Sequence, residues 1–438
     1  MKIRVSLLLI LLLVVVLVGW VLLPWQGALV LAALLAVWLA ATRAGRRALS
    51  VAGVGISTLG QRLGASAVIV VGIAGVVGVL VAMLAMAEGY AETLRRTGSA
   101  DSALVLRGAS DAEVTSGLDR DSVVQIAQTP GIARDAKGEP LASPEVIVAA
   151  NLPIKGGLAD EEGSVQLRGV GPQAWAVRPQ VRIVEGRRFT PGLRELIVGR
   201  GAVRQFAGLV PGHEIRLGSQ MWMVAGVFAS GDALESEIWA DADIVAQTYE
   251  RGSSRNSVTV RLADPNGFAA FKRALEANPQ LKIEAMTTLD YFSKQSEGTT
   301  AVIRVIGIVV GAIMAVGAMF GALNTMFAAV AARAREIATL RAIGFAGLPV
   351  VVAILLETML LALLGGILGG ALAWLLFNGY AASTMAAGSV GKLSFELHVT
   401  AAVLWQGLKW ALAIGFIGGL FPAARAATMP VTTALREL

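Results

Sequence analysis

The sequence contains no cysteine and only two histidines, His213 and His398, among its 438 residues. The first absence excludes disulfide bonds and thiolate metal or redox sites. The second leaves little scope for imidazole catalysis or metal binding. Charged residues are also scarce, at 16% of the chain, whereas 55% of the residues are hydrophobic. That composition is too apolar for a disordered chain and unusual for a soluble globular one.

The few charges are unevenly distributed along the chain. The formal net charge is +6, yet residues 89–300 carry 23 Lys and Arg against 26 Asp and Glu. The basic excess therefore belongs to the apolar remainder, and we expect no nucleic acid among the partners. This pattern is typical of a membrane protein that carries one large, slightly acidic soluble domain.

Six apolar segments are near or above the ~20 residues that a helix needs to cross the hydrocarbon core of a bilayer. They are residues 5–23, 27–42, 64–87, 305–332, 349–377 and 399–424. The first two are separated by Pro24-Trp25 and predict an N-terminal transmembrane hairpin over residues 1–42. Residues 1–23 also fit a signal peptide, but the apolar stretch that follows them favours a retained helix.

Basic residues set the expected orientation, because short loops rich in Lys and Arg stay in the cytoplasm. Arginines occur between the second and third segments, between the fourth and fifth, and in the tail: Arg43, Arg46, Arg47, Arg62, Arg333, Arg335, Arg341, Arg425 and Arg436. Both termini are therefore expected in the cytoplasm, with residues 89–300 outside. Residues 43–63 form a predicted cytoplasmic amphipathic segment, and residues 64–88 the first helix of the core.

Residues 89–300 predict an α+β domain whose two ends, at residues 87–96 and 289–300, continue membrane helices. Strand and helix patterns alternate in two β-α-β halves, over residues 103–150 and 257–285, with Asp264-Pro265 expected to start the second helix. That succession favours a ferredoxin-like unit. It is interrupted by a β-rich insertion over about residues 151–251, where short strands are punctuated by glycine.

No constellation of residues indicates an enzyme. The acidic residues at 160–162 and between 232 and 243 lack the spacing of a calcium loop. Residues 388–393 depart from the phosphate-binding loop, because Leu393 stands where that motif requires Ser or Thr. We expect neither a metal site nor a nucleotide-binding domain in this sequence.

Two features inside the predicted spans point to helix contacts. Small residues four apart let helices approach closely, as in Gly307 with Gly311 and Gly365 with Gly369. Charged residues within a span are costly. For Glu357 we favour a role in orienting its helix over proton relay, and we expect Lys409 to extend toward the membrane surface.

The most informative segment is residues 331–344, with the sequence Ala-Ala-Arg-Ala-Arg-Glu-Ile-Ala-Thr-Leu-Arg-Ala-Ile-Gly. Ile337, Leu340 and Ile343 fall on one face of a helix. Gly344 suits its C-terminal cap. A short amphipathic helix between two spans can lie on the membrane surface, or it can dock an apolar ridge in the groove of a partner.

Around this segment the chain resembles the ABC transporter permeases of the MacB/FtsX type, a family that includes the LolC and LolE lipoprotein-releasing subunits and the glycolipid-export permease DevC. The resemblance covers about residues 48–438. It is carried by Arg335-Glu336-Ile337, Leu340-Arg341-Ala342-Ile343-Gly344, Glu357, Gly365-Gly366, Gly369 and a tail with Pro422, Arg425, Pro430, Leu435 and Arg436. Residues 186–227 are similar to the periplasmic core domain of that family.

The resemblance implies an α-helical membrane protein of the bacterial inner membrane, with a four-helix core and an inserted periplasmic domain. With the N-terminal hairpin the count is six transmembrane helices. Residues 301–438 would form the FtsX-like permease domain, and residues 333–344 the coupling helix seated on a separate cytoplasmic ATPase. The coupling residues would be Arg333, Arg335, Glu336, Ile337, Leu340, Arg341, Ile343 and Gly344. That partner would bind ATP and Mg²⁺, and this chain no cofactor.

The same resemblance implies a second permease copy, as a homodimer or a paired paralogue, in contact with membrane lipids. A periplasmic adaptor and an outer-membrane channel can complete such a system. In mechanotransmission, ATP-driven closure moves the stalk helices and the periplasmic domain, which exports or extracts a lipoprotein, glycolipid, peptide or drug. The alternative is an FtsX-like transducer that controls a cell-wall hydrolase without transport. A membrane sensor without an ATPase is disfavoured by segment 331–344 and the tail.

Overall fold

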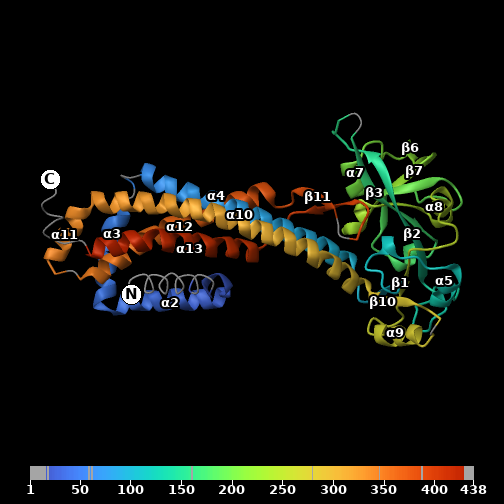
Figure 1. Ribbon diagram of the computed structural model, residues 1–438, viewed down its shortest axis with the longest axis horizontal. Helices are drawn as coiled ribbons and strands as arrows, with labels where there is room; N and C mark the ends of the chain where they lie inside the picture. Colours follow the sequence, from blue (N-terminus) through green and yellow to red (C-terminus); the bar gives the residue numbers. More distant parts are fainter. Residues whose placement is uncertain are drawn as a thin grey trace. The chain divides into compact units, whose positions relative to one another are not determined.

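The computed structural model describes residues 16, 19–57, 60, 63–158, 161–278, 280–344, 346–385 and 388–428. The chain divides into two compact units, whose elements are labelled in Figure 1. Unit 1 comprises Met1–Ala85, Ile303–Asn378 and His398–Leu438, and unit 2 comprises Met86–Val302 and Gly379–Leu397. Helices α4 (Leu63–Thr97) and α10 (Thr288–Ala332) contribute residues to both units.

Unit 1 is built from long apolar helices. In the described part of the chain, four helices are long and apolar enough to cross a membrane: α4, α10, α12 (Gly347–Phe377) and α13 (Ala401–Thr428). They lie over the four apolar segments predicted for the core. The first predicted span, residues 5–23, lies largely outside the described residues, so the count of six helices stays a prediction.

The second predicted span is followed by a sharp bend. Helices α2 (Trp25–Ala41) and α3 (Arg43–Ser57) meet at an angle of 95°. Thr42 between them has an extended backbone, and its hydroxyl donates to Trp38 O and accepts from Gly45 N, both at 2.9 Å. One side chain thus ends one helix and begins the next, and the amphipathic segment becomes a separate helix.

Glycines on α12 bring it into contact with α4. A Cβ at Gly369 would lie 2.4 Å from Ala74 O, and one at Gly365 would lie 2.9 Å from Val70 O. Both neighbours are backbone atoms that cannot move aside without shifting the helix. The two helices therefore touch along their backbones, as small residues at a membrane-helix interface allow.

Helix α10 meets α4 through the other predicted pair. A Cβ at Gly307 would lie 2.8 Å from the Met83 Cβ, and one at Gly311 would lie 3.1 Å from the Leu80 Cδ1. An adjacent face of α12 meets α13 in the same way, because a Cβ at Gly366 would lie 2.8 Å from the Ala411 Cβ. All four core helices are thus joined at small residues.

The expectation that Lys409 extends toward the membrane surface is wrong. The residue is 5% exposed, and its Nζ donates hydrogen bonds to Val21 O at 2.5 Å and to Leu23 O at 3.1 Å. Trp20 Nε1 donates in return to Lys409 O at 2.9 Å. The accepting carbonyls end a helical stretch just before Pro24, where they lack intrahelical donors and carry partial negative charge. They replace the water that the ammonium would otherwise reach.

Unit 2 is an α+β domain built around one ten-stranded sheet. Its first and last elements form two β-α-β halves, whose strands pair antiparallel in the order β10-β1-β9-β2. These elements are β1 (Ser102–Arg107), α5 (Arg120–Ala127), β2 (Ala142–Pro153), β9 (Ser257–Arg261), α9 (Phe268–Glu276) and β10 (Ile283–Thr287). Their shared core includes Ile126, Phe271 and Leu275.

The predicted start of the second helix is wrong. Helix α9 begins at Phe268, after Gly267, rather than at Asp264-Pro265. Asp264 instead closes a turn, since its Oδ1 accepts from Asn266 N at 3.0 Å and its carbonyl accepts from Gly267 N at 2.9 Å. An Asx turn competes with a helix cap for the same side chain.

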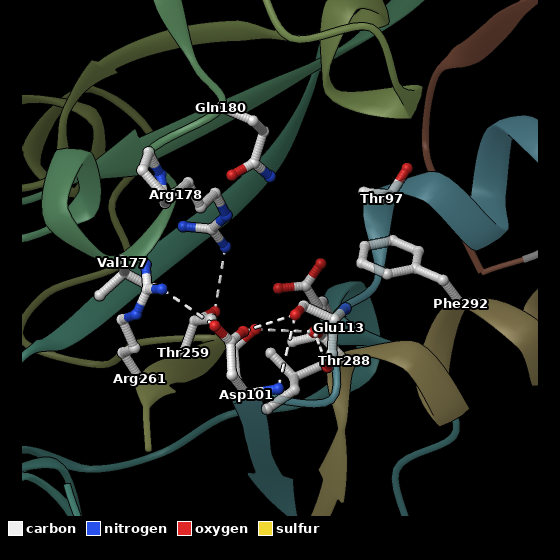
Figure 2. Close-up of a pocket in the computed structure, with 14 residues that line it drawn as sticks. Thr97, Asp101, Glu113, Val177, Arg178, Gln180, Thr259, Arg261, Thr288 and Phe292 are labelled. Atoms are coloured by element: carbon white, nitrogen blue, oxygen red, sulfur yellow. Dashed lines mark hydrogen bonds and ion pairs between the residues drawn. The ribbon is translucent and has the colours of Figure 1, made fainter. Parts of the chain in front are cut away.

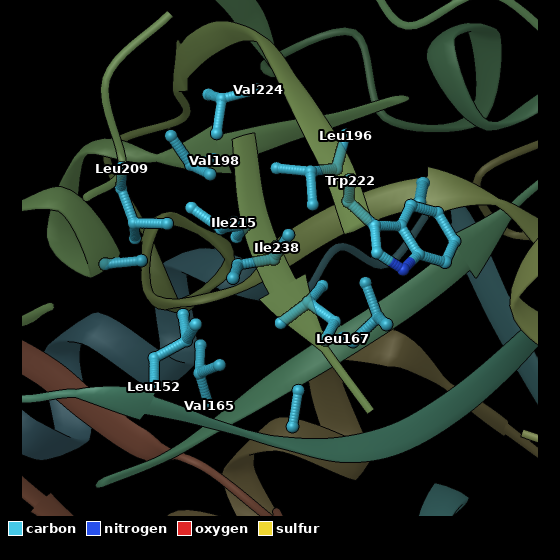
Figure 3. Packing of buried hydrophobic residues seen from close by; sticks show 14 of the residues in the cluster. Leu152, Val165, Leu167, Leu196, Val198, Leu209, Ile215, Trp222, Val224 and Ile238 are labelled. Carbon is cyan, nitrogen blue, oxygen red and sulfur yellow. The ribbon is translucent and has the colours of Figure 1, made fainter. Parts of the chain in front are cut away.

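The sheet continues through the insertion in the order β2-β3-β8-β5-β7-β4, with β6 on β7. These elements are β3 (Glu162–Val170), α6 (Ala174–Val177), β4 (Arg182–Gly186), β5 (Glu195–Gly199), α7 (Arg200–Gln205), β6 (Glu214–Leu217), β7 (Gln220–Ala229), β8 (Ile238–Asp241) and α8 (Ala242–Thr248). Figure 3 shows their core, in which Trp222, Leu167 and Ile238 are fully buried.

A hairpin of β11 (Ala381–Met385) and β12 (Lys392–Glu396) belongs to unit 2, although the sequence placed these residues in the domain 301–438. Ser394 N donates to Ser236 Oγ at 2.8 Å, and the Phe395 ring meets the Tyr90 ring edge-on at 5.6 Å. The hairpin is assigned to unit 2 by these contacts, which local sequence patterns do not reveal.

Candidate coupling site

Helix α11 (Ala334–Ala342) lies between the spans α10 and α12, within the predicted segment 333–344. Arg333 is its N-cap residue, and Ile343 its C-cap residue. Gly344 follows with φ of +101°, a left-handed conformation that glycine adopts at little cost. The coupling segment therefore contains a single nine-residue helix, with the non-helical residues Arg333 before it and Gly344 after it.

Arg333 joins α11 to α12 through an ion pair. Its Nη1 lies 3.2 Å from Glu357 Oε2, and its Nε lies 3.2 Å from Glu336 Oε2. The Arg333 and Glu357 side chains are only 12% and 7% exposed, whereas that of Glu336 is 61% exposed. A buried charge in a membrane helix requires such a partner, and this contact favours the helix-orienting role for Glu357.

Helix α3 completes this cluster from the other side. A Cβ at Gly55 would lie 2.7 Å from Glu357 Oε2 and 3.1 Å from Arg333 Nη1. Ala52 and Ala48 are also buried on α3, one and two turns before Gly55. Small residues on one face thus let α3 approach the ion pair closely.

An apolar cavity of about 340 Å³ lies between α3, α11 and α12. Its lining consists of Val51, Val54, Arg333, Glu336, Ile337, Thr339, Val350, Ala353, Ile354 and Glu357. The charged members of this set are those of the ion-pair cluster. The aliphatic members come from all three helices, so α3 forms one wall and α11 another.

The predicted apolar face of α11 is divided in the structure. Ile337 is buried and lines the cavity, whereas Ile343 is 72% exposed. Ile343 is the C-cap residue, one position beyond the last helical residue, Ala342. The side chain of Leu340 lies outside the described residues.

The remaining predicted residues of the site divide in a similar way. Arg335 and Glu336 are exposed on α11, and Arg341 is half-buried. In the tail motif, Pro422 is buried inside α13, and the guanidinium of the exposed Arg425 lies 5.7 Å from the Phe327 ring centroid of α10. Pro430, Leu435 and Arg436 lie outside the described residues.

Unit 2 contains a buried ionic network that the sequence analysis missed. Arg168, 1% exposed, donates to three carboxylates, with Nε and Nη2 bound to Glu237 at 2.7 and 2.8 Å. Its Nη1 and Nη2 reach Glu113 at 2.9 and 3.0 Å, and Nη1 reaches Glu145 at 2.6 Å. These five bonds match the five N–H donors of a guanidinium.

Burial opposes the charges in this network, but the ion pairs outweigh it. Burial alone would lower the pKa of Arg168, yet Glu113, Glu237 and Glu145 hold the pKa of its guanidinium well above the ordinary value. Burial would likewise raise the pKa of Glu145, whereas Arg178 and Arg168 keep that pKa below its ordinary value. Arg168 and Glu145 therefore stay ionised at neutral pH.

A polar pocket of about 130 Å³ lies beside the network and is drawn in Figure 2. It is lined by residues that include Thr97 from α4, Thr288 from α10 and the Arg178 of the network. Asp101 and Arg261 in its wall form an ion pair at 2.9 Å. Ser99 in the same wall donates its hydroxyl to Asp101 Oδ1 at 2.5 Å.

No group of three or more acidic or histidine side chains that could hold a metal ion occurs among the residues that the structure describes. The ionic network was not foreseen, because the three carboxylates are separated from Arg168 by 23 to 69 residues along the chain. Glu237 was noticed only as part of an acidic stretch, and the signal available was the apolar surroundings of Arg168.

Two family models match this chain. Residues 66–278 match the MacB-like periplasmic core domain, and residues 308–431 match the FtsX-like permease C-terminal domain. The first match begins in α4 and covers most of unit 2, and the second covers most of α10 and then α11 to α13. The coupling segment and the glycines of α12 lie within the second match.

The chain is also similar to curated relatives and to solved structures. The chain is 25% identical over 314 residues to the macrolide export ATP-binding/permease protein MacB of Escherichia coli, which covers 67% of this chain and 46% of that protein. It is 26% identical over 318 residues to MacB of Bordetella avium, with the same coverage. The periplasmic region of MacB from Actinobacillus actinomycetemcomitans is similar with a TM-score of 0.34 and 15% identity, over 44% of this chain and 91% of that one.

The chain spans about half the length of the curated relatives it matches. The match to the periplasmic core domain precedes the match to the permease domain along the chain. The described residues contain four apolar helices long enough to cross a membrane and an α+β domain between the first two of them. The chain therefore belongs to the MacB/FtsX-type ABC transporter permeases.

Proposed function

We propose that this chain is the inner-membrane subunit of a bacterial ABC transporter that works by mechanotransmission. A separate cytoplasmic ATPase, which binds ATP and Mg²⁺, acts on α11. Helices α4 and α10 then carry the motion to unit 2, a ferredoxin-like unit with a β-rich insertion, in the periplasm. The positive-inside pattern of the arginines supports this orientation, with both termini in the cytoplasm.

The observation that carries this proposal is the way α11 is held. Its exposed side bears Arg335 and Glu336, which can fix the orientation of a docked partner. Its buried side is tied to α12 by the Arg333–Glu357 pair. A force applied to the exposed side is thereby passed to a membrane helix instead of being lost in a mobile loop.

The cargo is proposed to be a lipoprotein, glycolipid, peptide or drug that is handled outside the lipid. The polar pocket of unit 2, at about 130 Å³, has room for only a few water molecules, whereas a more open pocket beside Leu152, Ile215 and Tyr249 has about 620 Å³. The cargo is proposed to bind outside the small polar pocket, in a dimer of this chain or with a paralogue. A periplasmic adaptor and an outer-membrane channel would complete the export path.

Charge reversal on α11 tests this proposal. Glu336→Lys places a cation at the exposed docking side, and we expect it to abolish stimulation of the co-expressed ATPase in nanodiscs. Glu284→Lys, an exposed charge reversal on β10, is the control and should leave stimulation unchanged. Full stimulation by the Glu336→Lys protein would refute the proposed docking.

A second assay separates transport from signalling. Proteoliposomes that release or move cargo on ATP hydrolysis would support export. ATP-dependent activation of a cell-wall hydrolase, with no movement of cargo, would instead identify an FtsX-like transducer.

A further inference from the structure

Helix α3 lies outside both matched family domains, the first of which begins at residue 66. We propose that α3 is a positioning element of the coupling site, and that it sets the orientation of α11 by pressing its Gly55 backbone on the Arg333–Glu357 ion pair. This inference rests on the proposed role of α11 in ATPase coupling. It assigns a function to an N-terminal segment whose sequence alone indicates none.

The first argument is the closeness of three helices at one point. Glu357 of α12 pairs with Arg333 at the start of α11, and Gly55 of α3 leaves no space for a side chain against either of them. The two charged side chains are almost fully buried. Any displacement of α3 would expose the pair to solvent, which weakens the attraction that holds the start of α11.

The second argument is the cavity between the same helices. Because about 340 Å³ of space separates parts of α3, α11 and α12, the orientation of α11 is not fixed by continuous apolar packing there. Val51 and Val54 of α3 form the wall that bounds this space together with Ile337 of α11. A tilt of α3 toward α11 would reduce the cavity, and a tilt away would enlarge it. The position of α3 thus decides how much room α11 has.

The third argument is that α3 is itself held firmly at its first turn. A Cβ at Gly45 would lie 2.5 Å from Trp38 O and from the Leu39 Cα, so the start of α3 touches the end of α2. Thr42 bonds both helices at this corner. Because the start of α3 is fixed to α2, Gly55 near the other end of the helix is held against the ion pair.

The test compares two glycines of the same helix in the full chain with its ATPase. Gly55→Leu forces a side chain into the ion pair, whereas Gly53→Leu is the matched control, since a Cβ there meets nothing within 4 Å. Gly55→Leu is expected to reduce ATPase stimulation about tenfold, because overpacking shifts the helix. The Gly53→Leu protein should retain full stimulation.

A structural readout accompanies the activity measurement. The chain has no cysteine, so Ser50→Cys on α3 and Ala342→Cys on α11, both exposed, accept spin labels without further changes. Electron-electron distance measurements should show a shifted or broadened distribution in Gly55→Leu and an unchanged one in Gly53→Leu. Should Gly55→Leu not fold, Gly55→Ala adds a single carbon 2.7 Å from Glu357 Oε2 and is expected to act in the same direction.

Variants of the ion pair complete the design. Arg333→Met should reproduce both the distance change and the loss of stimulation, and Arg333→Lys should restore much of each, because a cation can still reach Glu357. Equal stimulation and equal distances for the leucine variants of Gly55 and Gly53 would overturn the inference. If Glu336→Lys still uncouples the ATPase in that case, the proposed function survives while the role of α3 does not.

Discussion

Removal of Arg168 is the sharpest test of the electrostatics of unit 2. The native network holds three carboxylates and two guanidinium groups, since Arg178 also binds Glu145. Arg168→Met keeps a long apolar stem but leaves Arg178 as the one arginine of this network. Breaking a buried ion pair by removal of one partner costs ~3–5 kcal/mol, and a domain is stable by only ~5–15 kcal/mol. The variant should therefore lose a large part of the stability of unit 2.

The pH dependence gives the prediction its sign. In the native protein the arginines hold the pKa of Glu145 below its ordinary value of 4.5, so its stabilising contribution is present above that value and is lost at lower pH. In Arg168→Met, the unpaired buried carboxylates take raised pKa values. These carboxylates are then tolerated in the folded state only when they are protonated. The stability of the variant is therefore highest below their ordinary pKa and falls as the pH rises. Acidification from pH 7 toward pH 5 should stabilise the variant more than the native protein, in which, among the described carboxylates, only Asp232, with a pKa raised to about 6, gives such a gain.

Hydrogen exchange in nanodiscs measures this effect locally. Peptides from β2 and β3 should exchange ~100-fold faster or more in Arg168→Met at pH 7, the factor that ~3 kcal/mol represents. The difference should shrink at pH 5 after correction for intrinsic exchange rates. Arg182→Met, at an exposed position of β4, is the control and should exchange like the native protein. Native-like exchange of Arg168→Met at pH 7, or further loss on acidification, would refute this account of the network.

Two further predictions concern buried groups in the two units. Burial raises the pKa of Asp232 to about 6, so its ionisation destabilises unit 2 as the pH rises from about 4 to 6. The Asp232→Asn protein should therefore be more stable than the native protein at pH 7.5, by on the order of 2 kcal/mol. Thermal unfolding at pH 4 should show no such gain. Lys409→Met removes the donor to Val21 O and Leu23 O and should speed hydrogen exchange around residues 19–23. Lys409→Arg should largely preserve the protection of these residues. Equal protection in the native protein and both variants would contradict the role of Lys409 in anchoring this segment.

Local patterns were sufficient for much of the fold. Apolar run length located the helices α4, α10, α12 and α13, because a span must satisfy its backbone within one continuous segment. Alternation of strand and helix patterns located both β-α-β halves of unit 2. Even the end of α11 near Gly344 follows from one residue type in one conformation.

Interactions between distant segments were beyond those patterns. Lys409 was misjudged because its acceptors belong to a helix almost 390 residues earlier in the chain. The Arg168 network joins η2 (Glu113–Thr115), β2, β3 and the residue before β8, none of which is marked by its neighbours in sequence. The contacts of the hairpin of β11 and β12 with unit 2 escaped prediction for the same reason. At the coupling site, the charged helix was evident, but its contact with Gly55 was not.

The way in which α4 and α10 end inside unit 2 bears on how motion could reach that domain. Thr97 Oγ1 at the end of α4 accepts from Ala233 N at 2.9 Å, in the inserted part of the sheet. Tyr291 in the first turn of α10 accepts from Glu113 N at 3.1 Å, beside the Arg168 network. Since both hydrogen bonds are buried, water can replace them only if the domain opens. The network links β2 and β3, where the two parts of the sheet join, so a displacement of either helix would move unit 2 as one body rather than separate its halves.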